Sequence, residues 1–211
     1  MKINNSFVDI LGLFFFAYGA FAMSFAVFRG KPDWVLWFCY VGMILIGLGL
    51  LFRQPVLIAS QLNLVVIPLI FWLVDFGYLA TTGKTLYGIT NYFFSELLWP
   101  ARLISLEHFF LVPLGFLTLY LVKLKKGQGK VSLIISLAEA AGLYFLSRFF
   151  TSVNYNVNCV HTSCFPSVPT DTWYPWRWFM IVYLMILITH LIYFKMPFFE
   201  KNKVRSNKVV K

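Results

Sequence analysis

The chain has 211 residues, of which 60% are hydrophobic and only 12% are charged, whereas a soluble domain carries about 25% charged residues. A single core of this size cannot bury so much apolar surface, so the composition excludes an ordinary soluble domain. The net charge of +10 is concentrated in short clusters beside apolar runs, which disfavours nucleic acid as a partner. We therefore expect an all-α integral membrane protein whose main partner is the lipid bilayer.

Six apolar runs are each close to the ~20 residues with which a helix crosses a bilayer. They cover residues 7–28, 34–52, 56–80, 103–122, 131–150 and 174–194. We expect the first run to be a retained helix, because no small-residue cleavage site follows it. No long linker separates the runs, and residues 1–211 are predicted to form one membrane domain.

The lysines and arginines predict the orientation of this bundle. They gather in the connection 123–130 and in the tail 195–211, and such clusters beside spanning helices mark the cytoplasmic side. With both termini in the cytoplasm, twelve of the 18 basic residues lie inside and the remaining six outside. We therefore expect an N-in, C-in topology in the cell membrane, with the tail attracted to anionic lipid headgroups.

Two segments on the predicted outer side are not expected to span. The segment 81–102 is too polar, but its aromatic residues favour an interfacial helix or a re-entrant piece, and an ordinary loop is the alternative. The loop 151–173 is rich in Asn and Pro, as turns are, and its tryptophans suit the headgroup layer.

The three cysteines fall into two groups. Cys39 lies within the second run, where we interpret it as a small apolar residue. Cys159 and Cys164 flank His161 in the outer loop and could be metal ligands, but a structural zinc site usually has four ligands. A disulfide suits the extracytoplasmic side, so we predict a Cys159–Cys164 disulfide and neither a metal nor a cofactor.

An ionisable residue within a spanning helix is costly and is by default a functional hypothesis. In the predicted topology Asp75 lies near the outer end of the third helix, and Glu107 and His108 near that of the fourth. These residues could share one layer with Arg148 and Arg177, roughly 5–8 Å below the outer surface by helix rise. We take His108 as the candidate general base, because imidazole titrates near neutrality, with Asp75 or Glu107 as its partner. Adjacent helical residues point about 100° apart, so we do not expect Glu107 and His108 to face one partner.

The alternative for this layer is structural: one of its carboxylates pairs with one of its arginines and fixes the order of the helices. Glu139 lies near the middle of the fifth run and is a candidate proton or cation site. Its own alternative is a hydrogen bond with Gln61, Asn63 or Thr189 that holds two helices together.

Small residues in two runs predict close contacts between helices. Gly42, Gly47 and Gly49 cluster in the second run, and Ala138 and Gly142 have the small-xxx-small spacing in the fifth. Both patterns allow backbones to approach.

Two short motifs resemble the androgen-induced family of six-helix membrane hydrolases, which cleave fatty-acid esters of hydroxy fatty acids, and their bacterial relatives. They are V-x-x-x-x-F-W, from Val66 to Trp72, and H-x-x-x-x-P, from His108 to Pro113. The similarity covers the third to fifth helices, and it implies that His108 is the histidine of a hydrolase.

The resemblance also implies a threonine nucleophile in a T-x-x-N motif, and here the pattern departs. The nearest match is S-Q-L-N, which begins at Ser60. Ser60 and His108 are predicted near opposite ends of their helices, roughly 20 Å apart in depth. A base must lie within hydrogen-bonding distance of its nucleophile, so Ser60 does not fit this role in the predicted topology.

Three functions follow from these patterns. The first, which we favour, is a hydrolase of lipid-like esters at an outer-leaflet site around His108, and it predicts a hydroxyl or thiol within reach of that ring. The second is a transporter or channel for protons, cations or small solutes, and it predicts a polar route that includes Asp75, Glu107 and Glu139. The third is a membrane scaffold in which these groups only pair internally.

Overall fold

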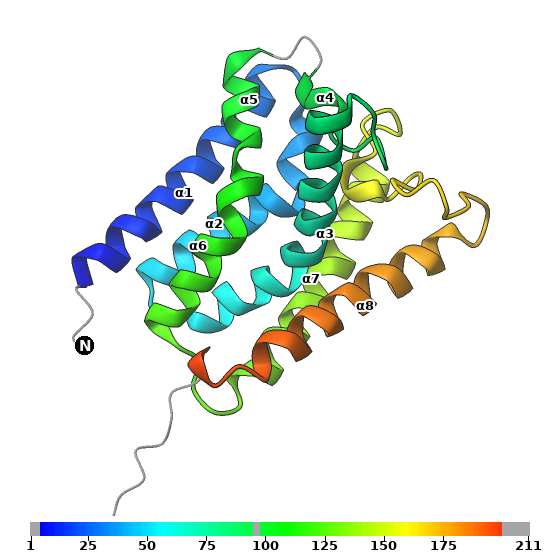
Figure 1. The fold of residues 1–211 in the computed structure, drawn as a ribbon. Helices are drawn as coiled ribbons and strands as arrows, with labels where there is room; N and C mark the ends of the chain where they lie inside the picture. Colours follow the sequence, from blue (N-terminus) through cyan, green and yellow to red (C-terminus); the bar gives the residue numbers. More distant parts are fainter. Residues whose placement is uncertain (1–4, 95–97, 200–211) are drawn as a thin grey trace, which may run out of the picture.

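The computed structural model describes residues 5–94 and 98–199, which form a bundle of helices and contain no strand (Figure 1). The longer helices are α1 (Asn5–Phe28), α2 (Phe38–Leu51), α3 (Pro55–Thr82), α6 (Glu107–Val122), α7 (Gln128–Phe150) and α8 (Tyr174–Phe194). The shorter pieces are η1 (Pro32–Leu36), α4 (Asn91–Phe94), α5 (Trp99–Ser105), η2 (Val157–Cys159) and η3 (Pro197–Phe199). The predicted all-α class is confirmed for the described residues.

Five helical stretches are long and apolar enough to cross a membrane: α1, α3, α5 together with α6, α7, and α8. α2 differs, because its 14 residues extend only about 21 Å, compared with ~30 Å of hydrocarbon. The structure thus provides five spans by length, rather than the six that the apolar runs predict.

α2 is short because the predicted helix over 34–52 is divided at Trp37. The backbone of Trp37 is extended, with φ −58° and ψ 133°, so η1 ends before it and α2 begins at Phe38. Cys39 therefore lies in the first turn of α2, rather than inside a continuous helix.

The fourth apolar run is also built from two pieces. α5 begins at Trp99, inside the segment 81–102 that was expected to be interfacial, and α6 begins at Glu107. Between them Leu106 has ψ −15°, displaced from the α-helical value near −42°. The same segment contains α4, whereas residues 95–97 lie outside the described residues.

α3 is the central helix of the bundle. It contacts α2, α6, α7 and α8, and the core around it includes the fully buried side chains of Met43, Ile46, Leu62 and Leu111. Large apolar side chains on the outside of the bundle are exposed instead, as at α8, where Met180 is 74% exposed. A lipid environment would cover this outer surface.

Glycine brings α1 and α2 into backbone contact. A Cβ atom at Gly47 would lie 2.7 Å from the backbone nitrogen of Phe16, which is closer than real Cβ atoms approach other atoms. Gly142 in α7 has no atom within 4 Å of such a Cβ, and Ala138 is exposed. The small residues of α2 are therefore packing sites, whereas the prediction for Ala138 and Gly142 is wrong within this chain.

Both described ends of the chain lie at one end of the bundle, beside the connections between α2 and α3 and between α6 and α7. Arg53, between α2 and α3, donates to the carbonyl oxygen of Asn5 at 3.2 Å and pairs with Asp9 at 2.9 Å. The backbone N–H of Leu124, after α6, donates to the carbonyl oxygen of Phe199 at 2.7 Å. We call this the basic end, and the opposite end, where α2 and α6 begin, the site end.

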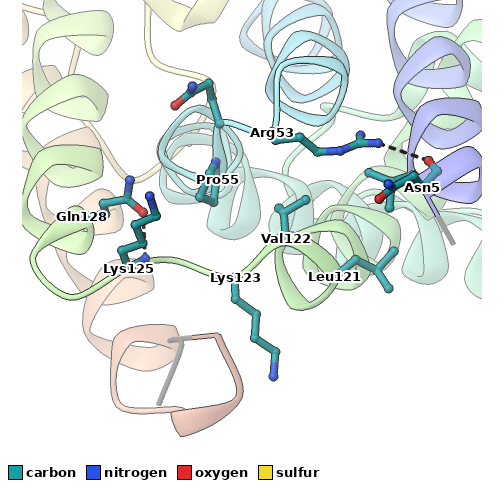
Figure 2. A pocket seen from close by; sticks show the side chains of 10 residues that line it. Asn5, Arg53, Pro55, Leu121, Val122, Lys123, Lys125 and Gln128 are labelled. Carbon is teal, nitrogen blue, oxygen red and sulfur yellow. Dashed lines mark hydrogen bonds between the residues drawn. The ribbon is translucent and has the colours of Figure 1, made fainter. Parts of the chain in front are cut away.

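A cavity of about 450 Å³ opens at the basic end. Its lining includes the cationic side chains of Arg53, Lys123 and Lys125 together with the amide of Gln128. Figure 2 shows Arg53 directed toward Asn5 and Lys125 beside Gln128. The lining of this cavity therefore favours water and anionic groups. None of the predicted site residues belongs to it.

Candidate functional site

Cys39, Glu107 and His108 come together at the site end. The sulfur of Cys39, a carboxylate oxygen of Glu107 and a ring nitrogen of His108 all lie within 4.8 Å of one another. The first residue belongs to the first turn of α2, and the other two open α6. A thiol, an imidazole and a carboxylate are groups that both nucleophilic sites and metal sites use.

Glu107 is the most enclosed of the three groups. Its side chain is completely buried, no N–H or O–H group of the described residues donates to its carboxylate oxygens, and the thiol of Cys39 is its hydrogen-bonding neighbour. The nearest cationic candidate is His108, whose Nδ1 lies 3.8 Å from Oε1. A buried carboxyl with so few polar partners is costly, which keeps Glu107 a candidate site residue.

The ring of His108 is fixed on two sides. Nδ1 lies 2.8 Å from the carbonyl oxygen of Ser105, which can only accept, so Nδ1 carries the proton and donates. The ring stacks on the indole of Trp72, with centroids 4.3 Å apart and an interplanar angle of 22°. Nε2 is thereby left as the nitrogen with a free lone pair, which is the form required of a base or of a metal ligand.

Further aromatic side chains pack against Trp72, on which this imidazole stacks. Trp72 contacts the rings of Phe76, Phe93 and Phe109 at centroid distances of 5.0, 6.3 and 5.6 Å. Its Nε1 donates to the hydroxyl of Tyr92 at 3.0 Å. The resulting wall is apolar with polar groups at a few points, as is typical of sites for small apolar ligands.

The expectation that Glu107 and His108 do not face one partner is wrong, because both reach Cys39. Their Cα–Cβ directions differ by about 100° on a helix, but a ligand atom of each side chain still lies within 4.8 Å of the thiol.

Cys39 was missed by the sequence prediction, which took it as a small apolar residue. The signal was its depth: Cys39 is five residues from the start of the run 34–52, and His108 is five residues from the start of the run 103–122. Both runs start at the same predicted side, so the same reasoning that grouped Asp75 with His108 would have included the thiol.

Asp75 has a different role from the one predicted. One carboxylate oxygen accepts from the backbone N–H groups of Leu86 and Tyr87 at 2.9 and 2.8 Å, and the other accepts from the N–H and hydroxyl of Thr90 at 3.0 and 2.7 Å. Because these four bonds occupy both oxygens, Asp75 holds the turn after α3 in place. The structure does not bring it to His108.

The two arginines of the predicted layer also have other partners. Arg148 donates to the carbonyl oxygen of Val160 at 3.2 Å and to Nδ1 of His161 at 3.1 Å. Arg177 forms a bidentate pair with Asp171 at 2.6 and 2.9 Å. The described residues therefore do not show the interhelical ion pair that was the structural alternative for Asp75 and Glu107.

Glu139 belongs to a separate group of polar side chains between α3 and α7. Its Oε2 accepts from Nε2 of Gln61 at 2.7 Å, and Nδ2 of Asn63 donates to the hydroxyl of Ser136 at 2.9 Å. Hydrogen bonds of this kind hold helices together in membranes. The Gln61 contact is one of the alternatives that the sequence left open for Glu139.

The loop between α7 and α8 contains a disulfide between Cys159 and Cys164. A disulfided sulfur does not act as a thiolate ligand, so His161 is left as the one candidate metal ligand of the C-V-H-T-S-C segment. Burial and the guanidinium of Arg148 lower the pKa of His161.

The residues that could hold a metal ion are instead those of the site. A thiolate, an imidazole and a carboxylate are the ligands that Zn²⁺ prefers, and three protein ligands with one open position are typical of catalytic zinc. Tetrahedral ligands at 2.0–2.3 Å lie about 3.3–3.8 Å apart, slightly closer than the 4.8 Å limit found here. Cys39, Glu107 and His108 therefore fit a metal after a small contraction.

Ser60, the counterpart of the family threonine, is not near His108. It lies in the first two turns of α3, and its hydroxyl donates to the carbonyl oxygen of Leu57 at 2.8 Å. α3 starts beside Arg53, so Ser60 lies toward the basic end.

Comparison of the chain with models of known families, with curated proteins and with solved structures finds no match.

Proposed function

We propose that the chain crosses the membrane six times, with both termini on the cytoplasmic side. Helix length alone supports five passes, but five would place the two chain ends on opposite sides. The contacts of Arg53 with Asn5 and of Leu124 with Phe199 place both described ends at the basic end. This arrangement needs an even number of passes, with η1 and α2 together as the additional one.

The basic end is the cytoplasmic end in this proposal, since lysine and arginine clusters mark that side. Lys123 and Lys125 of the cavity lie there. The site end then faces the outer leaflet, in the cell membrane. Cys39 lies in the first turn of α2, and Glu107 and His108 lie about two helical turns from Trp99, where the span made of α5 and α6 begins.

At this site we infer a membrane-embedded hydrolase that acts on lipid-like esters through Cys39. The observation that carries the proposal is the thiol within 4.8 Å of His108 and Glu107. An ester hydrolase at His108 requires a hydroxyl or thiol close to the ring, and the sulfur of Cys39 lies within 4.8 Å of it, whereas Ser60 lies toward the other end of the bundle. In the proposed mechanism, substrate binding shortens this separation to hydrogen-bonding distance, as is common when catalytic groups engage a substrate. The aromatic wall around Trp72 suits the apolar part of such a substrate.

The chemistry proceeds in two balanced halves. The unprotonated nitrogen of the His108 ring accepts the thiol proton, the sulfur of Cys39 forms a bond to the ester carbonyl carbon, and the carbon–oxygen bond to the alcohol breaks. The alcohol leaves with the proton from the imidazolium, and a thioester remains on Cys39. Water then gives a proton to His108 and attacks the thioester, which releases the fatty acid and restores the thiol.

Glu107 and the first turn of α2 act on the charges that form during the reaction. Glu107 stabilises the imidazolium that forms during each proton transfer, as the acidic member of a triad does. It also opposes negative charge on the sulfur, whereas the N-terminus of α2 favours that charge. The N–H groups of Phe38, Tyr40 and Val41 are used by Asn158 and Trp37, so the amide of Cys39 is the donor that we assign to the oxyanion.

Ester turnover by purified protein in detergent tests this proposal. With a long-chain p-nitrophenyl ester as substrate, we expect turnover by the wild type and a loss of at least about 100-fold in Cys39→Ala and His108→Ala. His190→Ala is the matched control, because it removes a buried histidine at the other end of the bundle. A turnover rate in Cys39→Ala equal to that of the wild type would contradict the proposal.

A metal-dependent hydrolase is the second candidate, and the grouping of a thiol, an imidazole and a carboxylate within 4.8 Å of one another favours it. In that case Cys39, Glu107 and His108 would hold the ion, which would act as a Lewis acid and lower the pKa of a bound water. Metal analysis of the purified protein separates the two candidates. One equivalent of zinc that is lost in Cys39→Ala supports the metal, and a metal-free active protein supports the thioester.

A further inference from the structure

A buried asparagine of the loop after α7 fills the gap between η1 and α2. Asn158 is only 6% exposed. Its Oδ1 accepts from the backbone N–H of Phe38 at 3.0 Å, and its Nδ2 donates to the carbonyl oxygen of Leu36 at 2.8 Å. One amide side chain thus satisfies the backbone groups on both sides of Trp37, where the helix is interrupted.

Asn158 is itself held by two more helices. Its Nδ2 also donates to the hydroxyl of Ser147 in α7 at 3.2 Å, and its carbonyl oxygen accepts from Nε1 of Trp178 in α8 at 2.9 Å. The residue adopts φ 53° and ψ 21°, a left-handed conformation that asparagine tolerates better than most residues. It therefore connects the start of α2 to both helices that flank the loop.

The disulfide lies directly beside this connection. Asn158 precedes Cys159, which is joined to Cys164, and the hydroxyl of Tyr174 donates to the carbonyl oxygen of Cys159. The disulfide and the Tyr174 bond thus both hold Cys159, the residue that follows Asn158.

We propose that Asn158 is a positioning residue for Cys39. The residue that it bonds, Phe38, directly precedes Cys39, and the first turn of a helix has no intrahelical acceptors for its N–H groups. The bond to Phe38 therefore sets where α2 begins and where its first side chains point. The inference rests on the proposed role of Cys39 as nucleophile, because it concerns the direction of that thiol toward His108.

Asn158→Gly is the informative substitution, because glycine accepts the left-handed conformation and only the side chain is lost. Asn156→Gly is its matched control. Asn156 is also left-handed, with φ 42°, but its Oδ1 accepts from His161 and Thr162 within the loop, at 2.9 and 3.0 Å. Asn158→Asp is a second variant, which keeps the acceptor for Phe38 and loses the donor.

The first readout is the single-turnover rate of Cys39 acylation at increasing ester concentration, measured on the monodisperse folded fraction. We expect Asn158→Gly to lower the maximal rate by about tenfold or more, since small misplacements of reacting groups cost this much, with the half-saturating concentration unchanged. Asn156→Gly should stay within about twofold of the wild type. An equal maximal rate in Asn158→Gly and wild type would overturn the inference and leave the proposed function intact.

The second readout does not depend on catalysis. Hydrogen exchange in the peptide 36–44 and alkylation of Cys39 by a small maleimide should both change in Asn158→Gly and not in Asn156→Gly. If the wild type forms no acyl-enzyme, the proposed function fails, and these two rates alone decide the positioning role. Rates equal to the wild type in Asn158→Gly would then overturn it.

Discussion

The thiol of Cys39 lies beside the carboxylate of Glu107, although the two residues belong to helices that are far apart in the sequence. Glu107 is completely buried, so this contact forms inside the bundle and not on its surface. The imidazole of His108 completes this cluster of three side chains. We propose that the cluster hydrolyses esters, and the polar residues outside it have other roles that can be tested separately.

Asp75→Asn should destabilise the fold without changing the chemistry. Asparagine can keep the bonds from Leu86 and Tyr87 on its oxygen, but its amide nitrogen cannot accept from Thr90. We expect a loss of about 1–3 kcal/mol, seen as a lower melting temperature in detergent, and unchanged turnover per folded molecule. Asp171→Asn is the control, because that carboxylate lies in an exposed pair with Arg177 and should matter little. A loss of turnover in Asp75→Asn equal to that of His108→Ala would restore Asp75 as the partner of the base.

Glu139 should prove to be a helix-packing residue. Glutamine retains an oxygen that can accept from Gln61, so Glu139→Gln should change stability by less than about 1 kcal/mol. Glu139→Leu leaves the buried amide of Gln61 without its acceptor and should cost about 1–2 kcal/mol. Proteoliposomes with a pH gradient provide the opposing test. A proton flux through the wild type that Glu139→Gln abolishes would favour the transporter and contradict this assignment.

The loop after α7 should loosen in acid. Because burial and Arg148 lower the pKa of His161, the unfolded chain takes up a proton on this ring at a higher pH than the folded chain does. Stability from this group is therefore fully present above the ordinary pKa of about 6.5 and is lost as the pH falls through the folded pKa. Protonation would also place an imidazolium against the guanidinium that now donates to Nδ1.

Hydrogen exchange of the loop peptides from pH 7.5 to pH 5 measures this effect. After correction for the intrinsic pH dependence of exchange, protection should decrease below about pH 6.5 in the wild type. His161→Gln should lack this decrease, since its side chain does not titrate. Equal profiles for the two proteins would show that another group controls the loop.

Gly47→Ala should separate α1 from α2. The added methyl group would meet the backbone of Phe16, and overpacking of this kind costs about 1–3 kcal/mol. Gly142→Ala is the matched control, because the same methyl group would enter open space and alanine is the better helix former. Thermal unfolding of both variants in one detergent is sufficient, and equal melting temperatures would contradict the close contact.

The helices could be predicted from the sequence because apolar runs of this length report directly on the requirement to span lipid. The break at Trp37 could not, since neither proline nor glycine marks it and its backbone groups are satisfied by Asn158, which lies 120 positions away from Phe38. The shortness of α2 was missed for the same reason.

The site was predicted in part. Glu107 and His108 were singled out because ionisable groups in apolar helices are costly, and both belong to the cluster. Cys39 was not, because a thiol in an apolar run is compatible with simple packing. Asp75 was assigned to His108 by depth alone, and depth does not show that a turn eleven residues later occupies its carboxylate.

Mass spectrometry of the intact protein after brief mixing with a long-chain p-nitrophenyl ester tests the central claim most directly. We expect the wild type to gain the mass of one acyl group on Cys39, to lose it in neutral hydroxylamine as a thioester does, and to acquire none in Cys39→Ala. His108→Ala should acquire the group much more slowly. An adduct on another residue, or turnover of the ester without any adduct in the wild type and with zinc bound, would contradict the thioester mechanism.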